Sequence, residues 1–197
     1  MRISQIYSNI SFRKKLVAKA AVSAANESLP CKIYKLSSEK DKLYFDKMPN
    51  LSDWEESDFI NAFREELEEN PEGKRIYALE DKDENCLGLI ELYDNDLSKR
   101  KSIAYLETCP KNSAENKKRN IKYIGETMLA FATALAKKEK SSVLTVPIAL
   151  QSAEAFYIDK CGFMPSISFG LALFGDMYEK LIDKNAEHTD RKIKLVI

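Results

Sequence analysis

The chain has 197 residues, of which 44% are apolar and 31% are charged, and this is the composition of an ordinary globular protein. A chain of this length accommodates one domain with its own core, or one domain with an extension. The 31 lysines and arginines balance the 31 aspartates and glutamates, so the net charge of zero gives no support for nucleic acid as the main partner.

The cysteines, the histidine and the hydropathy pattern argue against several kinds of site. The four cysteines form no C-x-x-C pair and His188 is the only histidine, so no metal site is expected. A Ser-His-Asp triad or a Cys-His pair is not expected either, because it would need His188, which lies in a polar tail. The chain has no apolar run long enough for a membrane span and no secretory signal pattern, which predicts a cytoplasmic protein.

Residues 1–30 are predicted to be an N-terminal helical extension, in front of a main domain over residues 31–197. Isoleucines recur at helical spacing in the alanine- and serine-rich stretch 4–28, and Leu29-Pro30 ends it. The extension would be either a cap over the core or an arm that binds a partner.

The first half of the main domain is predicted to be a strand, a helix and an antiparallel meander. Residues 32–36 alternate charged and apolar side chains, as a strand does. Ser52 and Glu55 have the spacing of a capping box and predict the start of a helix that closes near Asn70. Short polar turns then separate three strands, predicted over residues 75–79, 86–93 and 102–109.

The second half alternates helices and strands. A long helix begins near residue 121, and the apolar run 143–148 is typical of a central strand covered on both faces. A helix that stops at Gly162 follows. The remaining elements are predicted as a strand over 166–174, a short helix over 177–182 and a final strand over 192–197. This order predicts an α/β fold, namely an α+β mixed sheet with helices on both faces.

Residues 120–129 join the meander to the long helix and have the character of a phosphate site. Lys117, Lys118 and Arg119 come just before this segment. A helix N-terminus attracts anions, because its unpaired N–H groups and the positive end of its dipole both point at them. The basic residues are therefore either ligands of phosphate or a solvated loop.

Two motifs and the order of the segments resemble the GNAT superfamily of N-acetyltransferases, over roughly residues 32–174. The pyrophosphate loop of that family reads Gln/Arg-x-x-Gly-x-Gly/Ala, followed by a leucine-like pair, which Met128-Leu129 supplies. Asn120 then takes the Gln/Arg position, Tyr123 the first glycine position and Gly125 the last. A second alignment of the loop motif, with Lys122 at the first position and Gly125 at the fourth, leaves the pair Met128-Leu129 out of place.

The second motif is the better match. Many GNAT enzymes carry Asn-x-x-Ala-x-x-Phe/Leu-Tyr-x-x-x-Gly-Phe at the helix that follows the fifth strand. Leu150 replaces the asparagine, and the matching residues here are Ala153, Phe156, Tyr157, Gly162 and Phe163.

The resemblance implies a GNAT fold with acetyl-CoA or coenzyme A as co-substrate and no metal. Thr108 and Cys109 would pair through their backbone with the pantetheine, like an added strand. The coenzyme A contacts implied in this way are Thr108, Cys109, Arg119, Asn120, Lys122, Tyr123, Ile124, Gly125, Glu126 and Thr127.

The resemblance also implies two catalytic residues. Tyr157 would donate a hydrogen bond or a proton to the departing sulfur, since a tyrosine with an ordinary pKa near 10 is a plausible acid towards a thiolate. Alternatively, Tyr157 is a half-buried aromatic beside Phe156. Glu107 would take the proton of the amine directly or through water, or else is solvated, and Glu91 on the adjacent strand is a weaker rival.

The sequence therefore predicts an acyl-CoA-dependent N-acyltransferase that moves acetyl to a primary amine by direct transfer. The acceptor would be a small molecule or a peptide, with no nucleic acid or membrane partner, and the loops around residues 54–63 and 166–174 would select it. The alternatives are a catalytically degenerate GNAT-fold binding or regulatory module and an acyltransferase with another acyl donor. The strand over 192–197 would offer an edge for a homodimer.

Overall fold

The structure is a computed structural model. It describes residues 14–25, 27–36, 43–55, 57, 60–69, 74–95, 99–113 and 115–196. Two strands and three helical segments come first: β1 (Lys15–Ala24), β2 (Glu27–Leu36), α1 (Leu43–Asp46), η4 (Leu51–Trp54) and α2 (Ile60–Glu69). The meander and the long helix follow: β3 (Lys74–Glu80), β4 (Cys86–Asn95), β5 (Arg100–Thr108), η6 (Pro110–Asn112), β6 (Ile121–Lys122) and α3 (Ile124–Lys138). The last elements are β7 (Val143–Val146), α4 (Gln151–Ala155), η7 (Phe156–Lys160), β8 (Met164–Ser166), β9 (Gly170–Phe174), η8 (Gly175–Met177), α5 (Tyr178–Thr189) and β10 (Lys194–Leu195).

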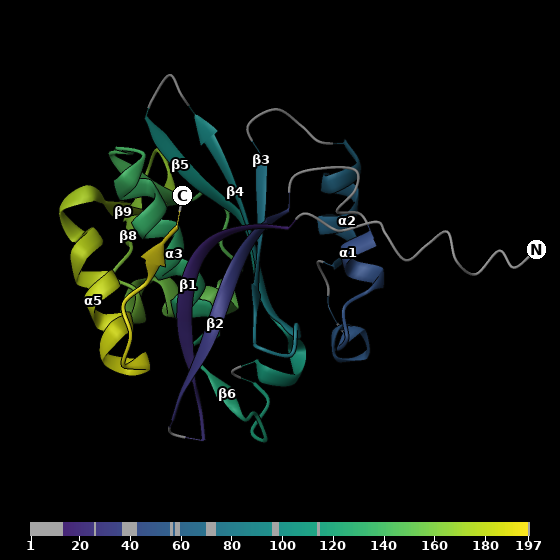
Figure 1. Cartoon of the computed structure of the whole chain (residues 1–197). Coiled ribbons are helices and arrows are strands. Elements are labelled where there is room, and N and C mark those ends of the chain that lie inside the picture. Colours follow the sequence, from purple (N-terminus) through teal and green to yellow (C-terminus); the bar gives the residue numbers. More distant parts are fainter. Residues whose placement is uncertain are drawn as a thin grey trace, which may run out of the picture.

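The strands form one mixed sheet. Their order is β10-β1-β2-β3-β4-β5-β7-β9-β8, and β6 pairs with β1 beside this path. The pairing of β5 with β7 is parallel, and the other pairs along the path are antiparallel. Figure 1 shows α1 and α2 on one face of the sheet, and α3 and α5 on the other. The predicted mixed sheet with helices on both faces is confirmed.

The N-terminal segment is a β-hairpin, and the predicted helical extension is wrong wherever the structure describes it. β1 pairs with β2 from Lys15–Lys35 to Ala24–Glu27, and with β10 on its other side. Alanine prefers a helix by at most about 0.7 kcal/mol over most other residues, and strand pairing on both sides with burial of Val17 outweighs this preference. A domain boundary after residue 30 would cut β2, and residues 1–13 lie outside the described residues.

Two further elements differ from the prediction. Ser52 lies in the 3₁₀ turn η4, and the side chain that accepts the backbone N–H of Ile60 at the start of α2 is Ser57. The single strand predicted over residues 166–174 is the hairpin of β8 and β9. Its turn spans residues 167–169, and β9 begins at Gly170, whose φ of +71° and approach to backbone carbonyls leave no room for a Cβ.

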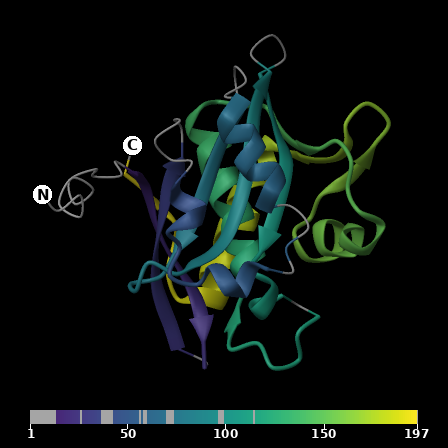
Figure 2. The ribbon, with the colours of Figure 1, turned by 90° about the vertical axis from the view of Figure 1, so that its right-hand side faces the viewer.

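Each face of the sheet has its own apolar core. One lies between the sheet and the helices α3 and α5, with Phe131 packed edge-on against Tyr77. The other lies under α1, η4 and α2 and contains Phe45, Trp54 and Phe63. Figure 2 shows these shorter helices lying across the strands on their side of the sheet. Across the described residues, no helix has the length and apolar character needed to cross a membrane.

Candidate functional site

The two parallel strands in the middle of the sheet, β5 and β7, pair over only part of their length. β5 and β7 are in register only from Arg100–Val143 to Ser102–Thr145, whereas β5 continues to Thr108. In the described structure, residues 103–108 of β5 thus have no ladder partner on β7. A strand edge of this kind can pair with an extended ligand through its backbone groups.

The helix α3 begins beside the end of β5. Its N-cap residue, Tyr123, has φ 65° and ψ 20°, the left-handed conformation that glycine adopts readily. The first helical hydrogen bond runs from Thr127 N–H to Tyr123 O at 2.9 Å, so the preceding N–H groups of α3 have no partner within the helix. The residue type departs from the glycine of the family pattern, but the backbone conformation is the one that glycine favours.

Three predicted segments meet at Gly125. A Cβ placed on this residue would lie 3.2 Å from Phe156 Cζ and 3.7 Å from Thr108 Oγ1. The end of β5, the start of α3 and the start of η7 therefore come together around one glycine. Its lack of a side chain is what permits this approach.

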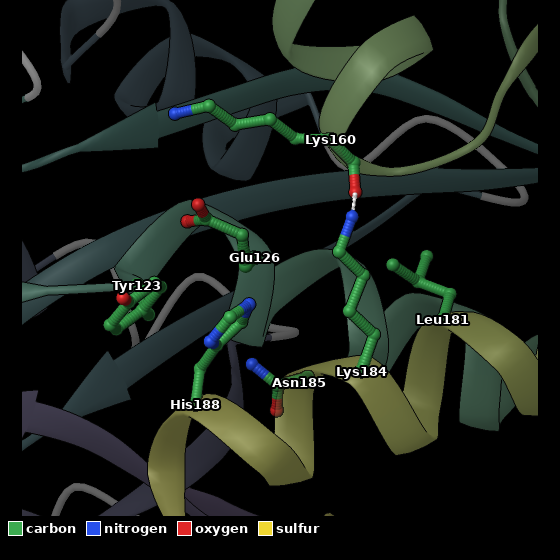
Figure 3. A pocket seen from close by; sticks show the side chains of 7 residues that line it. All are labelled: Tyr123, Glu126, Lys160, Leu181, Lys184, Asn185 and His188. Atoms are coloured by element: carbon green, nitrogen blue, oxygen red, sulfur yellow. Dashed lines mark hydrogen bonds between the residues drawn. The ribbon is translucent and has the colours of Figure 1, made fainter.

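A cavity of about 240 Å³ lies over the first turn of α3. The ring of Tyr123 stacks on His188 with a centroid separation of 4.6 Å and an interplanar angle of 3°. In Figure 3, Glu126 and these two rings lie on one side of the cavity. On another side, Lys184 Nζ donates to Lys160 O at 2.5 Å. The cavity thus lies between the start of α3, the end of η7 and α5.

Several predicted coenzyme A contacts have side chains that face the protein interior. Thr127 donates to Ala21 O at 3.1 Å and accepts from Asn185 Nδ2 at 3.1 Å, and Ile124 is buried. The thiol of Cys109 donates to Asp53 O at 3.6 Å in the core under η4, and burial raises its pKa to about 11. These residues can serve a ligand only through their backbone.

The basic residues before α3 lie in a folded loop. Asn116 Nδ2 donates to Lys111 O at 2.7 Å, and the N–H groups of Lys118 and Arg119 donate to Asn116 at 2.9 and 3.1 Å. Lys117, Lys118, Asn120 and Lys122 are exposed, and Arg119 is half-buried. Lys122 lies in β6 directly before the N-cap residue, so its backbone is held close to the start of α3.

Tyr157 is buried in the core on the α3 face. Its ring packs edge-on against Phe156 at 5.3 Å and against Phe163 at 5.5 Å. Burial, with a smaller effect from Cys161, holds the pKa of Tyr157 well above its ordinary value. The phenol therefore keeps its proton but is a weaker acid than an ordinary tyrosine, which suits donation of a hydrogen bond better than transfer of the whole proton.

Glu107 faces the opposite side of the sheet. It is half-buried, and Ser57 Oγ donates to its Oε2 at 2.7 Å. The rival carboxylate, Glu91, is fully buried, and its Oε1 lies 3.5 Å from Lys74 Nζ. The pairing of β4 with β5 is regular from Glu107 to Glu91, and a β-bulge follows directly, where Tyr105 and Ile103 face the consecutive residues Glu91 and Leu92. Glu107 is the more accessible of the two carboxylates.

No protein-family model matches the sequence, and no curated protein matches it. Solved structures do match. A presumed acetyltransferase from Exiguobacterium sp. 255-15 has a TM-score of 0.53 at 14% identity, over 76% of this chain and 97% of that chain. The spermidine N-acetyltransferase of Vibrio cholerae, in a dodecameric structure, has a TM-score of 0.51 at 14% identity, over 75% and 95%. A KacTA–DNA complex has a TM-score of 0.50 at 18% identity, over 64% and 82%.

The fold is that of the GNAT N-acetyltransferases. The fold prediction made from the sequence is thereby confirmed. Of the two candidate catalytic side chains, Glu107 lies on the α2 side of the sheet and Tyr157 lies in the core on the α3 side. Within the described ranges, no group of three or more His, Cys, Asp or Glu side chains is placed to hold a metal ion.

Two residues beside the candidate site were not predicted from the sequence. His188 belongs to α5, which runs to Thr189 instead of ending near residue 182. The buried positions of α5 have helical spacing, but the polar Asn185 and Thr189 conceal it. Ser57 was missed because Ser52, with Glu55 three residues later, gave the stronger capping pattern.

Proposed function

We propose that this protein is an acyl-CoA-dependent N-acyltransferase that moves acetyl to a primary amine of a small-molecule or peptide acceptor. The observation that supports this most is the meeting of Thr108, Gly125 and Phe156 beside the parting of β5 from β7. It combines an unpaired strand edge, a helix N-terminus and a glycine in one place. The coarser conclusion, a GNAT fold, comes from the matched structures.

Coenzyme A fits the residues around this junction. Backbone N–H groups at the start of α3 would bind the pyrophosphate, with Gly125 allowing close approach and Arg119 and Lys122 adding positive charge. The backbone of residues 108 and 109 would pair with the pantetheine. Bound there, coenzyme A would supply an activated thioester. The four buried free thiols are consistent with the reducing cytoplasm that we propose as the location.

Transfer would form an amide C–N bond and break the thioester C–S bond. Glu107 would take the proton lost by the attacking nitrogen, directly or through one water. Tyr157 would stabilise the departing thiolate with a hydrogen bond from its hydroxyl, since its raised pKa disfavours transfer of its own proton, and the thiolate would then take a proton from water. The two side chains face opposite sides of the sheet, so the acceptor would approach from the α2 side.

A GNAT-fold binding or regulatory module is the second candidate. Leu150 at the asparagine position of the second motif, 59% exposed, favours it because leucine offers no amide to the pantetheine. A different acyl donor is favoured by the apolar cavity beyond β7, where Ile148 is 88% exposed. The DNA in one matched structure belongs to that complex, and the zero net charge of this chain favours an amine acceptor over nucleic acid.

Thermal unfolding with coenzyme A and acetyl-CoA tests the proposal. At 100 times its Kd, a ligand stabilises by about 2.7 kcal/mol, which raises the Tm of a domain of this size by roughly 5–10 °C. Release of free thiol is then followed over a panel of primary amines. No rise in Tm with either ligand would refute coenzyme A binding. A rise without turnover would favour the binding module.

A further inference from the structure

Ser57 lies between η4 and α2 and contacts both the helix and Glu107. Its hydroxyl donates to Glu107 Oε2 at 2.7 Å and accepts the backbone N–H of Ile60 at 2.9 Å. A hydroxyl has one proton to give, and of these two partners only the carboxylate can accept it, so the two bonds fix its orientation. One side chain therefore joins the start of a helix to the candidate base.

The segment before Ser57 is fixed to the sheet that carries Glu107. Asn50 Nδ2 donates to Cys86 O at 2.9 Å, and the Cys86 N–H donates to Asn50 Oδ1 at 2.9 Å. Trp54 Nε1 donates to the same carbonyl at 3.1 Å. Since Cys86 begins β4 and β4 pairs with β5, the serine is held in place from the sheet as well as from α2.

We propose that Ser57 is a positioning residue for Glu107. It holds the carboxylate in one orientation, and as a donor it favours the ionised form that can take up a proton. The inference rests on the proposed function, because it assumes that Glu107 accepts the proton of the acceptor amine. It adds a residue that neither sequence motif contains.

The elements around Glu107 carry other titratable and charged groups. These are Tyr105 of β5 and Cys109 after it, Asp53 of η4, Lys111 of η6, Glu91 of β4 and Lys74 of β3. Asp53 pairs with Lys111 at 3.2 Å, and Glu91 with Lys74 at 3.5 Å. None of these groups is itself substituted in the Ser57 variants, and Ser57→Thr, which keeps the hydroxyl, controls for changes around the site.

The test compares Ser57→Gly with Ser57→Thr and Glu107→Gln. Glycine at an N-cap costs only a few tenths of a kcal/mol relative to serine, so it removes the donor and largely keeps the start of α2. Threonine keeps the hydroxyl. With Ser57→Gly, the acid limb of kcat/KM against pH should move up by roughly 0.5–1 pH unit, as expected for a lost bond to a partly exposed carboxylate. The Ser57→Thr profile should coincide with that of the wild type.

Each outcome decides the inference. If the Ser57→Gly profile coincides with the wild type while Glu107→Gln loses the acid limb, Ser57 does not position the base. If Glu107→Gln keeps full activity, the assumption about the base falls and the inference falls with it. If the wild type has no turnover, the proposed function fails. Titration of the ¹³C-labelled Glu107 carboxyl then tests whether the Ser57 hydroxyl favours the ionised carboxylate. Equal titration midpoints in Ser57→Gly and Ser57→Thr would overturn the inference about Ser57.

Discussion

Substitution of Gly125 by alanine separates a phosphate-binding role for this glycine from a packing role. Alanine is favoured over glycine in a helix by about 1 kcal/mol. The new methyl would stand 3.2 Å from Phe156 Cζ, so the edge of that half-buried ring must move by a few tenths of an ångström. That repacking costs about 1 kcal/mol, at the low end for an added methyl group. The two effects nearly cancel, and the Tm should change by no more than about 4 °C.

Coenzyme A binding should respond much more strongly. If Gly125 admits the phosphate as proposed, the added methyl group would hinder the approach of the phosphate to the N–H groups at the start of α3. The loss of one charged hydrogen bond, worth about 1.5–3 kcal/mol, raises Kd by roughly 10- to 100-fold. Isothermal titration calorimetry with coenzyme A measures this. The matched control is Gly175→Ala, whose Cβ would make only ordinary contacts at 3.6 and 3.9 Å. A lower Tm with an unchanged Kd would refute the phosphate role and leave Gly125 as a packing residue.

Three other substitutions test the site and the core. Tyr157→Phe should lower kcat by about 100-fold or more while the Kd of coenzyme A stays within threefold, and Tyr178→Phe, another buried tyrosine, should change neither. Burial raises the pKa of Glu139, but hydrogen bonds from Arg75 and Lys101 lower it to about 2, so stability present above pH 4.5 is lost as the pH falls towards 2. In urea unfolding, Glu139→Gln should flatten that pH dependence. Leu150→Asn should raise both the Tm and the affinity for coenzyme A.

The fold was predictable where local chemistry sets the boundaries. Between β3 and β4, Asp81 Oδ1 accepts the N–H groups of Asp83 and Asn85, both at 2.9 Å, and such an aspartate turn is visible in the sequence. Pro110 ends β5 for a reason that is equally local, since proline has no N–H for a ladder. The hairpin of β1 and β2 was not predictable in this way. Its alanine-rich strand is stabilised by partners far away in the sequence, at β10, α3 and α5.

The candidate site likewise has a part that was predictable from the sequence and a part that was not. Gly125 and Phe156 each belong to one of the two family motifs, and Thr108 lies at the end of the strand before the first motif, so their meeting was predictable from the resemblance. The stacking of Tyr123 on His188 and the bond from Ser57 to Glu107 depend on where separate elements pack. No spacing in the sequence encodes them, because the partners are 65 and 50 residues apart.

Of the three departures from the family motifs, Tyr123 and Leu150 have different physical consequences, and Leu150→Asn shows why. Tyr123 acts through its backbone, which already has the conformation of a glycine position. Leu150 is the N-cap of α4, with φ −61° and ψ 138°, and it makes no side-chain cap. An N-cap asparagine is worth about 1 kcal/mol over an apolar residue, or roughly 2–4 °C in Tm. Its amide would also face the proposed pantetheine path. A higher Tm with unchanged coenzyme A affinity would contradict that path, whereas a gain in both would mark Leu150 as the departure that weakens binding.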